Sequence, residues 1–213
     1  MFRLAVISDV HADLHALTDA LLQIDRLRCD AIVCAGDLVD FGLFPDETLS
    51  LLAERRIPTA RGNHDRWAVE RRASQGGGWE LSKGSRRFLA ALPPSYSLER
   101  EGVRVAVHHA SPRGDMDGIH PQQIDFELAA AHLHQAAADI VLVGHTHIAF
   151  ALDVEGVGVI ANPAALLRDP ADGAENPPAT GTFGILELPS RRFSVHRAND
   201  GEEAEIIRRT LGR

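Results

Sequence analysis

The sequence predicts an α+β fold in which two mixed β-sheets face each other and helices flank them, a four-layer α/β/β/α sandwich. Two observations lead to this prediction. In the first part of the chain, short apolar runs alternate with segments of helical period, which is typical of a parallel sheet with covering helices. In the last third, short apolar runs follow one another without helical segments between them, which indicates a second set of strands.

The first 60 residues supply three expected strands and two expected helices. Leu14, Leu17, Leu21 and Ile24 recur every three or four residues, so they form one apolar face of the first helix. Pro45 suits the first turn of the second helix, because its missing N–H would have no partner there. The strands are expected at 2–7, 31–35 and 57–60, and the second helix at 45–55.

The remaining elements follow from the same periods. A polar helical segment after Asp65 leads to a run of three glycines at 76–78, and the next helix is stopped by Pro93 and Pro94. Glu101 and Gly102 fit the turn of an antiparallel hairpin. The expected helices are 82–91 and 122–137, the hairpin strands are 96–100 and 103–108, the later strands are 140–143, 148–153, 157–160, 183–188 and 193–197, and a surface loop is expected at 169–180.

Size and composition indicate one globular domain over residues 1–213. A chain of this length buries a substantial core without disulfides. Cys29 and Cys34 do not form a Cys-x-x-Cys pair, which suits free thiols in a reducing compartment. Apolar runs are shorter than the roughly 18 residues of a membrane span, and the first residues turn polar too early for a signal peptide. We therefore expect a cytoplasmic protein without membrane attachment.

The charge balance limits the class of partner. The formal net charge is −8, and no run of Lys and Arg is longer than two residues. This argues against a surface that grips duplex nucleic acid or an anionic membrane. A locally positive site and a homo-oligomer both stay open. Composition leaves the 11 histidines unexplained.

Residues of metal-ligand type follow five of the expected strands. Taken singly, each is more often a helix cap or a surface residue, but the carboxyl ends of strands meet at one edge of a sheet, where ligands bind. Mixed carboxylate, imidazole and amide ligands suit Mn, Fe, Zn or Ni, and their number suits two divalent ions that share one carboxylate. These residues are Asp9 and His11, then Asp37, then Asn63, His64 and Asp65, then His108 and His109, and finally His145 and His147.

Five ordered motifs resemble those of the calcineurin-like metallophosphoesterase superfamily. The resemblance extends from Leu4 to about Asn162. The segments 36–42 and 162–165 are similar to small bacterial and archaeal phosphodiesterases, although Ala164 and Ala165 replace the usual Gly-Ser. The motifs are Asp-x-His at 9–11, Gly-Asp-x-x-Asp at 36–40, Gly-Asn-His-Asp at 62–65, His-x-Ser-Pro at 109–112 and Gly-His-Thr-His at 144–147.

The resemblance implies the metallophosphoesterase sandwich fold and a set of roles. Asp37 would bridge two ions, together with a water that attacks phosphorus in line. His64 would lie beside the ions and protonate the leaving group, and Asp40 would accept the other ring N–H of His64. The implied ligands of the first ion are Asp9, His11 and His147, and those of the second ion are Asn63, His109 and His145.

Several alternatives stay open on the sequence. His108 competes with His109 for one ligand position, and the motif favours His109. Arg61, Arg113 and Arg168 are candidate phosphate contacts, with Arg168 favoured by an Arg-Asp pair similar to the bacterial branch.

The expected activity is hydrolysis of phosphodiesters or small phosphomonoesters. The alternatives are a dinucleoside-polyphosphate hydrolase, a protein phosphatase, which would have Arg at position 41 instead of Phe, and a non-catalytic scaffold. The loops 74–79 and 113–125 are expected to form the rim that selects substrate.

Overall fold

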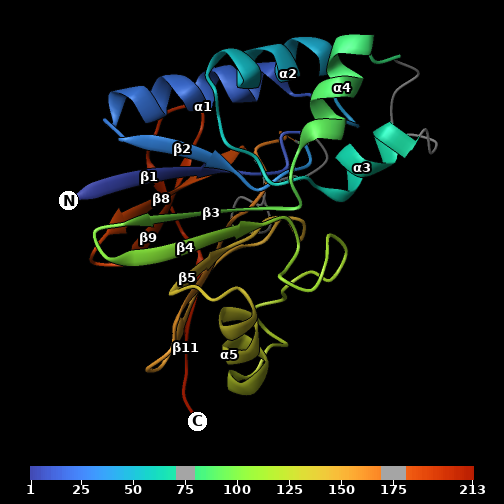
Figure 1. Cartoon of the computed structure of the whole chain (residues 1–213). Helices are drawn as coiled ribbons and strands as arrows, with labels where there is room; N and C mark the ends of the chain where they lie inside the picture. Colours follow the sequence, from blue (N-terminus) through green and yellow to red (C-terminus); the bar gives the residue numbers. More distant parts are fainter. Residues whose placement is uncertain (71–79, 169–180) are drawn as a thin grey trace.

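The computed structural model describes residues 1–70, 80–168 and 181–213 (Figure 1). The run of glycines at 76–78, Trp79 and the expected loop 169–180 lie outside these ranges. The described helices are α1 (Leu14–Arg26), α2 (Pro45–Glu54), α3 (Asn63–Glu70), α4 (Lys83–Ala91) and α5 (Phe126–Gln135). The described strands are β1 (Phe2–Ile7), β2 (Ala31–Cys34), β3 (Ser95–Arg100), β4 (Val103–His108), β5 (Ile140–Leu142), β6 (Ala149–Val154), β7 (Gly158–Pro163), β8 (Thr182–Leu188), β9 (Arg192–Arg197), β10 (Glu203–Ala204) and β11 (Ile207–Leu211).

Two mixed sheets lie between helical layers, as the sequence predicts. One sheet has the order β10-β9-β8-β1-β2, and the other has the order β11-β6-β7-β5-β4-β3. Helices α1, α2 and α4 lie outside the first sheet, and α5 lies outside the second (Figure 1). This is the four-layer α/β/β/α arrangement that the sequence predicts.

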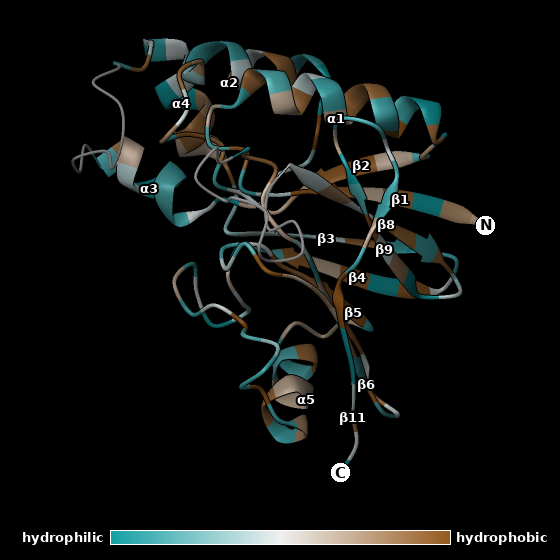
Figure 2. Cartoon of the chain, turned by 180° about the vertical axis from the view of Figure 1, so that it is seen from behind, coloured by the Kyte–Doolittle hydropathy of each residue, from teal (hydrophilic) through white to brown (hydrophobic). Residues whose placement is uncertain are grey.

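The alternation of side chains along the strands explains the layers. In β1, Ala5 and Ile7 pack into the core beneath the helices, whereas Leu4 and Val6 pack between the two sheets. Strands with apolar residues on both faces are buried on both faces, which requires a layer on each side. In Figure 2, α1 alternates hydrophilic and hydrophobic colours along its length, in keeping with a helix that buries only one face.

The expected strand at 57–60 is wrong. Only Thr59 forms a bridge, to Cys34, and Pro58 cannot donate to a ladder because it lacks an N–H. The segment nevertheless lies along β2, where the N–H of Cys34 donates to the carbonyl of Pro58 at 2.9 Å and the N–H of Ala60 to the carbonyl of Cys34 at 3.0 Å. The third loop of the expected site is therefore held next to the second.

Three further differences concern boundaries and pairing. The helix expected from 122 begins at Phe126, because Asp125 caps it by accepting from the N–H of Leu128 at 2.9 Å. The late strands do not form one set, since β6 and β7 join the second sheet whereas β8 and β9 return to pair beside β1. Strands β10 and β11 were not predicted. No described helix combines the length and apolarity needed to cross a membrane.

Candidate metal centre

The parallel pairing of β1 with β2 places the loops after these strands side by side. The N–H of Asp9 donates to the carbonyl of Gly36 at 2.9 Å, and the N–H of His11 donates to the carbonyl of Asp37 at 3.0 Å. Strands β4 and β5 are also parallel, and the N–H of Gly144 donates to the carbonyl of His109 at 2.7 Å. Backbone hydrogen bonds alone thus hold the loop after β1 against the loop after β2, and the loop after β4 against the loop after β5.

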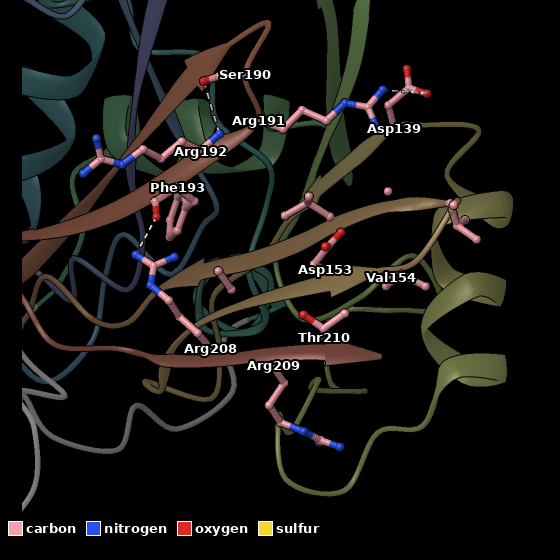
Figure 3. A pocket seen from close by; sticks show the side chains of 15 residues that line it. Asp139, Asp153, Val154, Ser190, Arg191, Arg192, Phe193, Arg208, Arg209 and Thr210 are labelled. Carbon is pink, nitrogen blue, oxygen red and sulfur yellow. Dashed lines mark hydrogen bonds and ion pairs between the residues drawn. The ribbon is translucent and has the colours of Figure 1, made fainter. Parts of the chain in front are cut away.

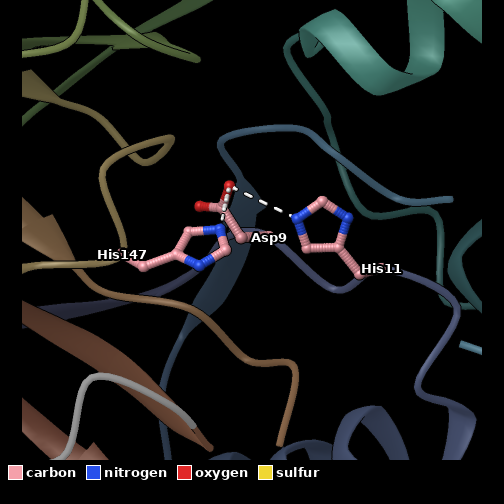
Figure 4. Close-up of side chains that lie close together, drawn as sticks. All are labelled: Asp9, His11 and His147. Carbon is pink, nitrogen blue, oxygen red and sulfur yellow. Dashed lines mark ion pairs between the residues drawn. The ribbon is translucent and has the colours of Figure 1, made fainter. Parts of the chain in front are cut away.

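The first group of ligand-type side chains is Asp9, His11 and His147, whose ligand atoms lie within 4.8 Å of one another. Figure 4 shows the carboxylate of Asp9 between the two rings. Its Oδ1 is 3.3 Å from Nε2 of His147 and 3.9 Å from Nε2 of His11. Asp9 and His11 are buried, whereas the side chain of His147 is 34% exposed, so the group opens to solvent on that side.

The second group is Asp37, His109 and His145, again with ligand atoms within 4.8 Å of one another. Oδ2 of Asp37 is 3.1 Å from Nε2 of His109. Oδ1 of Asn63 lies 2.9 Å from Nε2 of His109 and 3.0 Å from Nδ1 of His145, so the amide adjoins this group. His108 is part of neither group, and the pKa of its ring is lowered by burial and by the neighbouring His132.

Asp37 lies between the two groups. The same oxygen, Oδ2, is 3.1 Å from Nε2 of His109 and 3.9 Å from Nε2 of His11. Its other oxygen, Oδ1, accepts from the N–H of His64 at 2.8 Å. One carboxylate therefore faces both groups while a backbone donor holds its orientation, as a shared ligand requires.

His64 and Asp40 form a pair next to these groups. Nδ1 of His64 is 2.8 Å from Oδ2 of Asp40, which leaves Nε2 as the free end of the ring. The ring of His64 is 5.0 Å from that of His11 and 4.8 Å from that of Trp67, measured between centroids. The side chain of His64 is 12% exposed, so part of it is in contact with solvent.

The backbone at the site is strained. Five ligand-type residues have a positive φ, a backbone conformation that residues other than glycine rarely adopt. This conformation costs of the order of 1–3 kcal/mol per residue. Such conformations persist where the surrounding structure imposes them, and they cluster at functional sites. These residues are Asp9 (51°), His11 (48°), Asp37 (54°), His145 (66°) and His147 (55°).

Glycines allow the loops to approach one another. Gly36 has a φ of 96°, and a Cβ there would lie 2.7 Å from the carbonyl oxygen of Ala60 and from the nitrogen of Gly62. A Cβ on Gly144 would collide with Oγ of Ser8 and with Oδ2 of Asp9. The glycines in the sequence motifs are thus needed for close contact between loops.

Three further residues support the site without belonging to either group of ligand-type side chains. Asp65 is buried and accepts from the backbone N–H groups of Leu38 at 2.8 Å, of Gly62 at 2.9 Å and of Asp37 at 3.0 Å. Oγ of Ser8 donates to Oδ2 of Asp9 at 2.5 Å. Asn162 joins the loop after β5, since its Nδ2 donates to the carbonyl of Gly144 at 2.7 Å. The motifs contained Asp65 and Asn162, but a positioning role depends on partners that are distant in the sequence.

The charges of these side chains are strongly coupled. Burial lowers the pKa of His109, but the charge of Asp37 and the hydrogen bond to it outweigh burial and raise that pKa to about 10. Burial raises the pKa of Asp37, yet His109 and its hydrogen bond hold the pKa well below the ordinary value. Burial, followed by the charge of Asp37, raises the pKa of Asp65 to about 6. A cluster of buried carboxylates and imidazoles that depends on retained protons suits replacement of those protons by divalent cations.

The donor set fits two metal ions. Each group offers one carboxylate and two imidazoles, and Asn63 adds an amide oxygen to the second. Carboxylate and imidazole donors together suit Mn, Fe, Zn or Ni, whereas Ca prefers oxygen alone. Two candidate metal sites, at Asp9, His11 and His147 and at Asp37, His109 and His145, are thus consistent with a dinuclear centre.

The candidate phosphate contacts lie around this centre. Arg61 and Arg113 line a hollow of about 420 Å³ that also includes Arg66, His108 and His109. Arg168 lies on a different side, where its guanidinium pairs with Asp13 at 3.4 Å and with Asp19 at 3.1 Å. The structure thus brings Arg61 and Arg113 to one hollow and directs the charge of Arg168 toward carboxylates.

A hollow of about 790 Å³ lies elsewhere, between β9 and the strands β6, β7 and β11 (Figure 3). Its arginines already have partners. Arg191 is 3.9 Å from Asp139, Arg192 is 3.5 Å from Glu203, and Arg208 donates to the carbonyl of Phe193 at 2.9 Å. None of its lining residues belongs to the two metal groups.

Residues 2–189 match the model of the calcineurin-like phosphoesterase superfamily domain. An uncharacterized protein of Methanocaldococcus jannaschii is 28% identical over 166 residues, a match that spans 72% of this chain and 65% of that protein. A metallophosphoesterase structure from Sphaerobacter thermophilus has a TM-score of 0.68 at 25% identity, covering 92% of this chain and 87% of that one.

Two structures of lower identity share the fold. A hypothetical protein from Pyrococcus horikoshii OT3 has a TM-score of 0.73 at 18% identity, over 92% of this chain and 88% of that one. The E. coli phosphoesterase YfcE has a TM-score of 0.60 at 20% identity, over 95% of this chain and 96% of that one.

Proposed function

Because the chain belongs to the calcineurin-like phosphoesterase superfamily, we propose that it is a dinuclear metal-dependent hydrolase of phosphodiesters or small phosphomonoesters. The observation that carries the proposal is the position of Asp37. Its Oδ2 faces His109 of one metal group at 3.1 Å and His11 of the other at 3.9 Å. A carboxylate shared between two ions is the arrangement of two-metal hydrolases, whose ions lie roughly 3.5–4 Å apart.

The ions, when bound, supply positive charge that polarises the phosphoryl group and lowers the pKa of water. The residues of the chain do the rest. We assign Asp9, His11 and His147 to one ion, Asn63, His109 and His145 to the other, and Asp37 to both. Ser8 and Asp65 hold Asp9 and the loop of Asp37 in place, so that these ligands need little rearrangement when substrate binds.

His64 serves the leaving group in this proposal. Nδ1 of the ring faces Asp40 at 2.8 Å, so the ring is held with Nε2 directed away from that carboxylate. From there Nε2 donates a hydrogen bond to the ester oxygen and passes its proton to that oxygen, as the oxygen of a water bonds to phosphorus and the ester P–O bond breaks. Asp40 acts through His64, because it fixes the ring and its tautomer.

Further proposals concern the substrate and the cellular compartment. Arg168 stays a candidate substrate contact, and Asp13 and Asp19 would have to share its guanidinium with the substrate. A small phosphorylated molecule fits a site whose nearby hollow measures about 420 Å³. The free thiols of Cys29 and Cys34 support a reducing compartment, and we propose the cytoplasm.

A second candidate is hydrolysis of dinucleoside polyphosphates. Arg61, Arg66 and Arg113 line one hollow together with the candidate ligand His109. Guanidinium groups can bind further phosphate groups next to the one whose bond is hydrolysed. Although Asp115 already binds Arg66 at 2.6 Å, Arg61 and Arg113 make this hollow the place where a second phosphate would bind.

The test is turnover of bis(p-nitrophenyl) phosphate by the purified protein with Mn²⁺. We expect turnover in the wild type and a loss of about 10²–10⁴-fold in His64→Ala, the range for a general acid. His134→Ala is the matched control, because His134 is exposed on α5 in the opposite helical layer, and it should keep full activity. Absence of turnover with every divalent ion tried would favour the non-catalytic scaffold instead.

A further inference from the structure

Beside the candidate metal centre lies an apolar hollow of about 490 Å³. The loop after β1 contributes Ala12, the loop between β2 and α2 contributes Phe41, Leu43 and Phe44, and the segment after β7 contributes Leu167. Its size falls within the range of roughly 300–1,000 Å³ that is typical of small-molecule sites. The hollow adjoins the two metal groups, but none of their residues lines it.

The exposure of its side chains is unusual for apolar residues. Phe41 is 41% exposed, Leu43 is 76% exposed and Phe44 is 36% exposed. These three, within four consecutive residues, are among seven large hydrophobic side chains that are exposed in the described part of the chain. Clustered exposed apolar residues mark binding sites, whereas scattered ones need no explanation.

The hollow is continuous with the reaction site through Phe41. The ring of Phe41 lies 4.8 Å from the ring of His11 and 5.1 Å from the ring of His64, between centroids. His11 is a candidate ligand, and His64 is the residue proposed to protonate the leaving group. A group attached to the departing oxygen next to His64 would therefore lie near Phe41.

The loop that carries the hollow is held in place by backbone hydrogen bonds. The N–H of Gly42 donates to the carbonyl of His11 at 2.8 Å, and the N–H of Phe44 donates to the carbonyl of Ala12 at 3.2 Å. Phe41 itself has a φ of 61°, a strained conformation for a bulky residue. Strain that the surrounding hydrogen bonds maintain indicates a preformed position for this ring.

The charges at the rim are already compensated. Asp13 caps α1 by accepting from the N–H of Ala16 at 2.8 Å, and the guanidinium of Arg168 lies 3.4 Å from Asp13 and 3.1 Å from Asp19. The hollow thus offers aromatic and aliphatic surface without an excess charge. The ring of His15 packs edge to face on Phe44, with 5.5 Å between centroids, which adds a further aromatic wall.

We propose that this hollow binds a flat aromatic ring on the leaving alcohol of the phosphoester, the ring of either an aryl alcohol or a nucleobase. The proposal rests on the proposed function, because it takes His64 to mark the side of the leaving group. Aromatic walls that are preformed and open to solvent favour such a ring by burial and by edge-to-face contact.

The first arm of the test compares two methyl phosphodiesters that differ in the leaving alcohol, phenol or hexafluoroisopropanol, which have similar acidity. With Mn²⁺-loaded protein, we expect kcat/KM to favour the phenyl ester about tenfold, because a flat ring makes edge-to-face contacts with the aromatic walls that a branched fluoroalkyl group cannot make. Leu43→Ser should reduce this ratio to about threefold or less. Leu22→Ser is the matched control, because Leu22 is 48% exposed on α1 outside the hollow, and it should keep the ratio.

The second arm measures binding without turnover, by calorimetric titration of phenylphosphonate and methylphosphonate. Wild type should bind phenylphosphonate at least about tenfold more tightly, and Leu43→Ser should lose most of this preference. Adenosine 5′-phosphate against ribose 5-phosphate, as competing inhibitors, then separates the two sources of the ring. A preference for the adenine compound assigns the ring to a nucleobase, and its absence together with a phenyl preference assigns it to an aryl alcohol.

The outcomes separate this inference from the proposed function. Turnover of both diesters without a phenyl preference, and equal binding of the two phosphonates, would overturn the aromatic hollow and leave the phosphoesterase intact. No turnover, but a phenylphosphonate preference that Leu43→Ser removes, would show that the hollow binds an aromatic ring, and it would overturn both the hydrolase and the assignment of that ring to a leaving alcohol. The absence of both turnover and preference would overturn both.

Discussion

Nδ1 of His64 lies 2.8 Å from Oδ2 of Asp40, although His64 belongs to the first turn of α3 and Asp40 to the loop between β2 and α2, 24 positions earlier in the sequence. The relationship decides which ring nitrogen of His64 is available to a substrate. It also places a negative charge behind a ring that is proposed to donate a proton. Asp40 is thus a positioning residue whose removal should affect the reaction through His64.

Asp40→Asn should lower kcat about 10–100-fold with little change in KM, the usual range for loss of a residue that orients a catalytic group. Asparagine keeps the shape but offers His64 no charge and allows the wrong tautomer. Steady-state kinetics with bis(p-nitrophenyl) phosphate and Mn²⁺ measure the effect. Asp139→Asn is the matched control, because Asp139 binds Arg104 at 3.1 Å and lies outside the metal groups. An unchanged kcat in Asp40→Asn would contradict the role.

Metal binding should release protons. In the metal-free protein the charge of Asp37 overcomes burial and raises the pKa of His109 to about 10, so the ring is protonated at pH 8. An ion that binds this ring must displace its proton, and affinity should therefore rise as the pH increases toward about 10. Calorimetric titration of Mn²⁺ at pH 8, in two buffers with different ionisation enthalpies, should report the release of about one proton or more per chain. Zero release would show that His109 is already neutral.

The same raised pKa predicts how the stability of the metal-free protein depends on pH. A group whose pKa is higher in the folded state contributes stability that is complete below its unfolded pKa of about 6.5 and is lost as the pH rises through the folded value. For His109 that window extends from about 6.5 to about 10. Urea unfolding of the protein, freed of metal with a chelator, should show a free energy of unfolding that falls across this pH range. Saturating Mn²⁺ should reduce the slope of that free energy against pH. A stability that rises across the window in chelated protein would contradict the assignment.

Gly144→Ala should weaken the binding of the first ion at least about tenfold. The added Cβ would meet Oγ of Ser8 and Oδ2 of Asp9, so the carboxylate must move. Gly84→Ala is the control, because a Cβ there has only Oγ of Ser82 at 3.6 Å and lies in α4. Titration of chelated protein with Mn²⁺ measures both variants. Wild-type affinity in Gly144→Ala would show that Asp9 does not depend on this close contact.

The layers of the fold were predictable from local pattern, because the alternation in β1 and the helical period in α1 are properties of neighbouring residues. The prediction of a strand at 57–60 was wrong because Pro58 lacks an N–H, so that pairing is limited to one bridge, at Thr59. Strand β11 was missed because Arg208 and Arg209 interrupt the apolar pattern, and its pairing with β6 joins residues more than 50 positions apart. The return of β8 to β1 is likewise a long-range choice that local pattern does not contain.

The candidate ligands were predictable because they lie within the sequence motifs themselves. The structure brings Asp9, His11 and His147 together as one group and Asp37, His109 and His145 as another. The role of Asp65 was not visible, because it depends on the backbone N–H groups of Asp37 and Leu38, 28 and 27 positions away. The apolar hollow was missed for a related reason, since Phe41 and Leu167 meet only in the folded chain.

The central claim, a phosphoesterase with two metal ions, is tested most directly by reconstitution. Chelated protein is titrated with Mn²⁺, and bound metal per chain is measured alongside turnover of bis(p-nitrophenyl) phosphate. We predict that turnover follows occupancy of the second site and reaches its maximum at two ions per chain, as two three-residue groups around Asp37 imply. Full turnover without a divalent ion, or a maximum at one ion per chain, would contradict the account.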